Sequence, residues 1–95
     1  MISLDPQTGE IKQGSVASET RQILENLQHL LASNGSALDR VVKVNVFLYD
    51  MLEFENMNRV FREFFPDDPP ARTTCGVQLS LGVKVEIECV ALAGS

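Results

Sequence analysis

A helix-like stripe of apolar residues near the start of the chain most constrains its fold. Residues 15–35, "SVASETRQILENLQHLLASNG", place apolar side chains at three- and four-residue steps, the repeat of one helix face. The stripe consists of Val16, Thr20, Ile23, Leu24, Leu27, Leu30 and Leu31. Ser15 is in the position of an N-cap, and Gly35 suits the left-handed conformation that follows a helix end. Other elements of this 95-residue chain must therefore cover the stripe.

A β-branched run and a second helical pattern follow. Residues 40–49, "RVVKVNVFLY", alternate as a strand does, so one face is purely apolar and the other is mixed. The apolar face consists of Val42, Val44, Val46 and Leu48, and the mixed face of Val41, Lys43, Asn45, Phe47 and Tyr49. Asp50 and Glu53 have capping-box spacing, and Pro66 ends the helix that follows. The buried stripe predicted for that helix is Phe54, Met57, Phe61, Phe64 and Phe65.

The last third of the chain reads as two strands, "ARTTCGVQL" and "VKVEIECVAL", with a turn near Ser80–Gly82. The spacing predicts an antiparallel pair. The whole chain, residues 1–95, is then a single α+β domain, a sheet with both helices on one face. Its other face is expected to carry apolar side chains beside Arg72, Lys43 and two glutamates, which favours packing against further copies of the chain. The apolar members of that face are Phe47, Tyr49, Val90 and Leu92.

Composition excludes several classes of function. The net charge is −5 and the eight Lys and Arg residues are scattered, which argues against a nucleic-acid surface. No apolar run approaches the ~18 residues of a membrane span, and no signal peptide is predicted. The two cysteines, Cys75 and Cys89, are interpreted as buried free thiols of a reducing compartment. With His29 as the one histidine, no metal site is predicted.

Arg72 and the glutamates of the last strand are the candidate site. Alternation puts Glu86 and Glu88 on one face, and Arg72 begins the neighbouring strand. They can form an intersubunit ion pair, which is the commoner use of such residues. Alternatively, the guanidinium anchors a small carboxylic acid while a glutamate moves a proton. Asn58, a polar residue within an apolar stripe, is either a satisfied hydrogen-bonding group or part of that site.

Four segments carry a resemblance to a known family. "SLDPQTGEI", "ETRQILENLQHLLASNGSALDRVVKVNVFLYDM", "FENMNRVFREFF" and "PPARTTCGV…VKVEIECVAL" resemble the YjgF/RidA (Rid) family over essentially the whole chain. "VVKVNVFLYDM" and "PARTT" followed by "VEIE" are the most specific. The resemblance implies a chorismate-mutase-like fold and a homotrimer with pockets between subunits. It also implies a hairpin ahead of "LDPQTGE", so by this comparison the chain is N-terminally short.

The resemblance further implies an activity and its residues. It implies hydrolysis of 2-iminobutanoate and 2-iminopropanoate to 2-oxo acids and ammonia, without cofactor or metal, in the cytoplasm or the mitochondrion. Arg72 would bind the substrate carboxylate, Glu86 would assist water or proton transfer, and Asn58 would lie near the pocket. Thr74 occupies a pocket position where relatives often have cysteine. The alternatives are a non-catalytic trimeric protein that binds small acids or partner proteins, and a ribonuclease that inhibits translation, which the acidic charge argues against.

Overall fold

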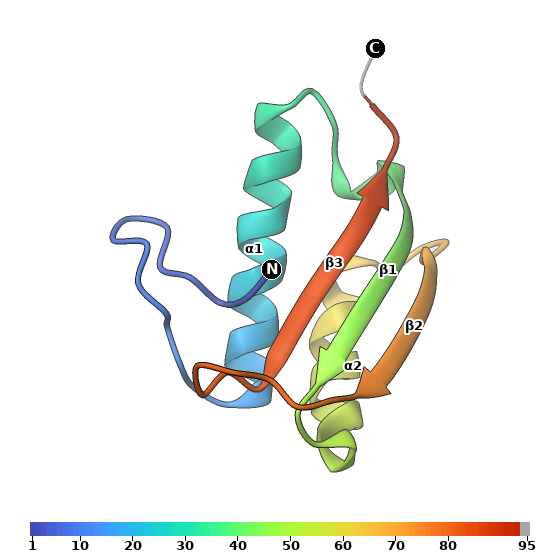
Figure 1. The fold of residues 1–95 in the computed structure, drawn as a ribbon. Helices are drawn as coiled ribbons and strands as arrows, with labels where there is room; N and C mark the ends of the chain where they lie inside the picture. The colour runs from blue at the N-terminus through green and yellow to red at the C-terminus, as the bar shows by residue number, and fades with distance from the viewer. Residues whose placement is uncertain (94–95) are drawn as a thin grey trace.

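Two helices pack on one face of a three-stranded mixed sheet in the computed structural model, which describes residues 1–93 (Figure 1). The helices are α1 (Val16–Ser33) and α2 (Phe54–Phe64), and the strands are β1 (Val41–Leu48), β2 (Ala71–Gly76) and β3 (Val85–Ala91). Short 3₁₀ turns at Leu38–Arg40 and Met51–Glu53 precede β1 and α2. This arrangement confirms the predicted α+β architecture with both helices on one side.

Helix α1 forms where its apolar stripe and caps predict. The Ser15 hydroxyl accepts a 3.0 Å hydrogen bond from the Ser18 backbone N–H, and Gly35 has a φ of +73° beyond the helix end. The stripe residues Val16, Thr20, Ile23, Leu24 and Leu27 are buried. Leu30 is half exposed, at 50%, and its neighbour Leu31 packs against the core instead, so the predicted burial of Leu30 was wrong.

A β-bulge corrects the predicted faces of β1. The register against β3 shifts between Val41 and Lys43, so that two residues of β1 occupy the space of one. Val41 therefore points into the core, with 7% of its surface exposed, whereas Val42 is 45% exposed. Beyond the bulge the alternation holds, and Val44, Val46 and Leu48 are fully buried as predicted.

The pairing of the last two strands was also predicted wrongly. β2 and β3 do not pair with each other; the sheet order is β2-β1-β3, with β1 parallel to β2 and antiparallel to β3. β1 is the most apolar of the three strands and takes the central position, where both edges are paired. Helix α2 makes the crossover that a parallel β1–β2 pair requires. The predicted turn at Ser80–Gly82 is present, with left-handed φ values of +64° at Leu81 and +73° at Gly82.

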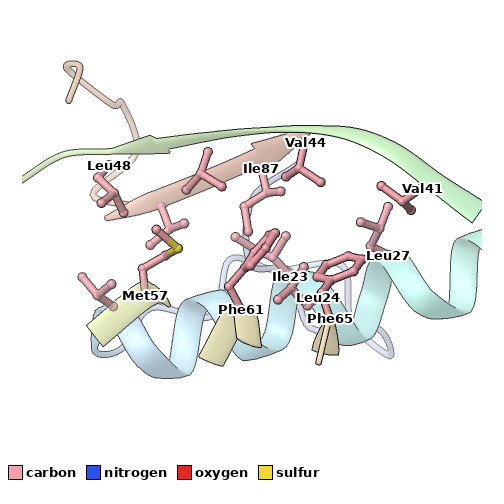
Figure 2. Close-up of a cluster of buried hydrophobic side chains, with 13 residues drawn as sticks. Ile23, Leu24, Leu27, Val41, Val44, Leu48, Met57, Phe61, Phe65 and Ile87 are labelled. Carbon is pink, nitrogen blue, oxygen red and sulfur yellow. The ribbon is translucent and has the colours of Figure 1, made fainter. Parts of the chain in front are cut away.

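The core lies between the sheet and the two helices (Figure 2). It consists of Val16, Ile23, Leu24, Leu27, Val41, Val44, Val46, Leu48, Met57, Phe61, Phe65, Val85 and Ile87. Residues ahead of α1 lie over the outer edge of β3, where Met1 and Ile87 exchange two backbone hydrogen bonds of 2.8 and 2.9 Å. One edge of the sheet is thereby partly covered by the chain's own first residue.

Candidate active site at the start of β2

Arg72 is positioned by the elements on either side of it. Pro69 and Pro70 end the loop after α2, and Arg72 follows as the second residue of β2. Its register partner on β1 is Val44, whose side chain is completely buried on the helix side of the sheet. Because paired residues of parallel strands point to the same face, the Arg72 side chain also points toward α2.

The Arg72 guanidinium contacts three side chains of the α2 segment. Its Nη1 donates a 2.7 Å hydrogen bond to the Oδ1 of Asn58, which is buried with 7% of its surface exposed. Its Cζ lies 4.6 Å from the ring centroid of Phe61 and 5.3 Å from that of Phe54, at cation–π distance. The guanidinium is thus held in one orientation while it keeps unused N–H donors.

Burial lowers the pKa of Arg72, and the positive charge of Arg62 lowers it further. The arginine still remains protonated at physiological pH, because its ordinary pKa lies far above that range. Within residues 1–93 no carboxylate forms an ion pair with Arg72; the ion pairs there are Arg21–Glu63 and Lys84–Glu19. The site therefore carries a half-buried positive charge without a counter-ion from the described part of this chain.

A cavity of about 570 Å³ opens beside this guanidinium. Its lining consists of Asn58, Phe61, Arg62, Phe65, Pro66, Pro69, Pro70 and Arg72. The volume is in the range of pockets that bind small molecules, and apolar walls with a few polar groups are typical of such pockets. A cationic, mostly apolar cavity can bind an organic acid, with its carboxylate on the arginine fork.

Thr74 lies on the same face of β2, two residues beyond Arg72. Its Oγ1 is buried and has no hydrogen-bond partner within the described residues. Buried hydroxyls are normally satisfied, so this unpartnered oxygen is an exception. Thr74 is not among the residues that line the cavity beside Arg72. Of the predicted site residues, the structure thus brings together Arg72 and Asn58, with Thr74 next along the strand.

Glu86 does not lie in the site around Arg72. It is the cross-strand partner of Phe47 on the outer face of the sheet, opposite the helices, and is half-buried. Glu88, two residues on, is exposed and accepts a 3.0 Å hydrogen bond from the Asn45 amide. The register of β3 is regular over both glutamates, so both point to that outer face as predicted.

The predicted placement of Arg72 beside the glutamates is therefore wrong within one protomer. β1 separates β2 from β3, which puts these strands about 10 Å apart, and the side chains of Arg72 and Glu86 project from opposite faces. The reason is the phase of β2, in which Arg72 and Thr74 align with the buried Val44 and Val46. A single small molecule cannot touch both groups in one copy of the chain.

Two charged residues of the structure were missed from the sequence. Glu19 is completely buried, and its carboxylate accepts backbone hydrogen bonds from Gly14 at 3.1 Å and Lys84 at 2.9 Å. Its position three residues after Val16, inside the apolar stripe of α1, was the available signal. Arg62 lines the cavity of Arg72, and its spacing of four residues from Asn58 could have placed both on one helix face.

Neither helix of the described residues is long and apolar enough to cross a membrane. Among residues 1–93 there is also no group of three or more His, Cys, Asp or Glu side chains that could hold a metal ion. The two cysteines are half-buried free thiols, and burial raises the pKa of Cys89.

Solved structures show the class of protein to which this fold belongs. Yeast Mmf1 superposes with a TM-score of 0.91 at 38% identity, over 100% of this chain and 75% of that one. RidA from an Antarctic Psychrobacter superposes with a TM-score of 0.89 at 34% identity, over 96% and 74% of the two chains. The fold is the chorismate-mutase-like α+β fold of the YjgF/L-PSP proteins.

Sequence comparisons agree with these structural comparisons. The sequence model described as Endoribonuclease L-PSP matches residues 1–93. Protein mmf1, mitochondrial, of Schizosaccharomyces pombe is 47% identical over 88 residues, which are 88% of this chain and 54% of that protein. A RutC family protein of Pyrococcus horikoshii is 44% identical, over 95% of this chain and 72% of the relative. The chain belongs to the YjgF/RidA family, also described as the Endoribonuclease L-PSP family.

One further relative has an informative name. Reactive Intermediate Deaminase A, chloroplastic, of Arabidopsis thaliana is 37% identical over 92 residues, 96% of this chain. The chain spans 49% of the length of that relative and 54% of mmf1.

Proposed function

We propose that this chain is a reactive intermediate deaminase, which hydrolyses 2-imino acids such as 2-iminobutanoate and 2-iminopropanoate to 2-oxo acids and ammonia. The observation that carries the proposal is the guanidinium of Arg72, oriented by Asn58 at 2.7 Å and without an ion-pair partner among residues 1–93. A fixed arginine fork beside a small cavity suits the carboxylate of such an acid. The name of the Arabidopsis relative supports the same reaction class.

The proposed site is completed by a second copy of the chain. Arg72 and Glu86 project from opposite faces of one sheet, so a shared substrate needs Arg72 from one protomer and Glu86 from its neighbour. The outer sheet face can supply that contact, because Tyr49, Val90 and Leu92 are each more than half exposed. We therefore include the homotrimer in the proposal.

The chemistry then needs no covalent intermediate. Arg72 holds the substrate carboxylate, with the Thr74 hydroxyl close by to bind a further polar group. Water adds to the C=N carbon, the Glu86 carboxylate takes a proton from that water, and the proton passes to nitrogen. This gives a carbinolamine, whose hydroxyl proton then passes to the nitrogen through Glu86. The C–N bond breaks as the C=O bond forms, and ammonia and the 2-oxo acid leave. The rate gain would come from orientation and charge stabilisation.

A coupled assay tests the proposal. A threonine dehydratase generates 2-iminobutanoate, and the protein is expected to accelerate formation of 2-oxobutanoate above the uncatalysed rate. Arg72→Ala is expected to abolish that acceleration, whereas Arg59→Ala, an exposed arginine outside the cavity, should leave it intact. No acceleration by the wild-type protein would refute the deaminase assignment.

A second candidate function has one observation in its favour. Within a single protomer the anion anchor is present but Glu86 is on the far face. A protein of this kind could bind small 2-oxo acids without turning over imines. Calorimetry that shows binding of 2-oxobutanoate, together with no acceleration in the coupled assay, would favour this binder.

The ribonuclease alternative is supported by the family description and opposed by the charge of this chain. With a net charge of −5, the chain lacks the excess of cations that RNA binding requires. Failure to bind single-stranded RNA even at low ionic strength would dismiss it. For the compartment we retain the cytoplasm and the mitochondrion, and the mitochondrial names of mmf1 and mmf2 favour the second.

A further inference from the structure

The cavity beside Arg72 contains a second guanidinium, that of Arg62 on α2. Both arginines line the cavity, and Arg62 is exposed whereas Arg72 is half-buried. The other lining groups within residues 1–93 are the Asn58 amide, two phenylalanines and three prolines. Two positive charges therefore line one small cavity that has no carboxylate among its described lining residues.

Nearby carboxylates do not neutralise this pair. Glu63, the residue after Arg62, points away and forms a 2.6 Å ion pair with Arg21 of α1. Neither Arg62 nor Arg72 forms an ion pair in the part of the chain that the structure describes. The charge of Arg62 also lowers the pKa of Arg72, as repulsion between two cations does. A ligand with two negative groups would relieve that repulsion at both ends.

We propose that Arg62 makes this site selective for 2-imino acids that carry a second carboxylate, the imines of dicarboxylic amino acids. The inference rests on the proposed function and names its substrate class. Arg72, fixed by Asn58, binds the carboxylate next to the C=N carbon, and Arg62 binds the distal carboxylate. The rings of Phe61 and Phe65 and the prolines form an apolar wall along the methylene chain between them.

Two stable 2-oxo acids of equal carbon number test the proposal. 2-Oxoglutarate has the second carboxylate, and 2-oxopentanoate has a methyl group in its place. Calorimetry is expected to show that the wild-type protein binds 2-oxoglutarate at least about tenfold more tightly, since an ion pair with Arg62 is formed with that ligand alone.

Variants of α2 assign the preference to one side chain. Arg62→Gln should weaken binding of 2-oxoglutarate far more than that of 2-oxopentanoate and so remove the preference, and Arg62→Lys should retain most of the preference because the charge remains. Arg59→Gln removes a charge from the same helix outside this cavity and should leave the preference intact. A preference that survives Arg62→Gln would overturn the proposal.

The remaining outcomes separate this inference from the proposed function. Acceleration of 2-iminobutanoate hydrolysis, together with equal binding of the two 2-oxo acids, would overturn the dicarboxylate selectivity alone. If neither 2-oxo acid binds and no imine is turned over, both the selectivity and the deaminase assignment fail.

Discussion

The Arg72 guanidinium donates a 2.7 Å hydrogen bond to Asn58, and this bond links the second residue of β2 to the buried face of α2. It explains why a polar residue interrupts the apolar stripe of that helix. The Asn58 oxygen accepts from a cation without cancelling its charge, so the guanidinium is oriented and remains attractive to an anion. A carboxylate in place of the Asn58 amide would form an ion pair with the guanidinium and so compete with a bound anion.

Two substitutions of Asn58 separate orientation from charge. Asn58→Ala should raise KM for the imino acid about tenfold with a smaller change in kcat, because the lost bond to a charged donor positions the substrate anchor. Asn58→Asp should keep Arg72 in place but also weaken acid binding, because the new carboxylate pairs with it. Asn56→Ala, on the exposed side of α2, is the matched control. An unchanged KM in both variants would show that Asn58 has only a structural role.

Glu19 should be a major determinant of stability. Its buried carboxylate accepts N–H groups from Gly14 and Lys84, and so ties the segments before α1 and β3 to the helix. Glu19→Ala leaves two backbone donors unsatisfied, and the free energy of unfolding should fall by about 3 kcal/mol. Urea denaturation measures the loss.

Two further variants test this explanation for Glu19. Glu19→Gln should recover only part of the stability, because an amide offers one acceptor oxygen where the carboxylate used two. Glu25→Ala on the exposed side of α1 should change the unfolding free energy by less than about 0.5 kcal/mol. Equal losses from the Glu19 and Glu25 truncations would contradict the role of the buried carboxylate.

The Arg21–Glu63 ion pair between α1 and α2 should make stability depend on acid pH. The hydrogen bond from Arg21 lowers the pKa of Glu63 below its ordinary value of 4.5. A lowered folded-state pKa means that the contribution is complete above that ordinary value and is lost as the pH falls through the folded-state one. Urea midpoints of wild type and Glu63→Gln should therefore differ slightly at pH 7 and converge progressively as the pH is lowered below 4.5. Glu55→Gln should show no such convergence, and a constant Glu63→Gln difference would refute the prediction.

The exposed apolar side chains of the outer sheet face should be needed for assembly. Val90 is 60% exposed and is the cross-strand partner of Lys43, so Val90→Glu can pair with that lysine in an isolated protomer. The variant should therefore stay folded but sediment as a 10.5 kDa monomer, whereas wild type is expected to sediment as the proposed trimer. Leu30→Glu, on the far end of α1, should not alter the oligomeric state. A monomeric wild-type protein would refute the trimer.

Helices were predicted well because their signals are local. The stripe and Ser15 cap of α1, and the stripe of α2 that ends before Pro66, depend on residues at most four positions apart. The alternation of β3 was correct for the same reason, with Val85 and Ile87 buried and Glu88 exposed.

The relation between strands was harder to predict, because it depends on distant parts of the chain. A period of two gives the faces of β2 but not their phase relative to β1, so Arg72 was assigned to the outer face although it aligns with Val44. The tight spacing of β2 and β3 suggested a hairpin, yet β1 lies between them. For the candidate site, Arg72, Asn58 and Thr74 could be identified from the sequence. Their separation from Glu86 could be seen only in the structure.

The bulge in β1 has a consequence for how substitutions in this strand should be interpreted. A scan of every position would show intolerance to polar residues at Val41, then at Val44, Val46 and Leu48, with a permissive interval of two residues after the first. If the scan were interpreted with an uninterrupted period of two, Val42 would be assigned to the interior. A tolerated polar substitution at Val42 would then be mistaken for a destabilising change that another residue compensates.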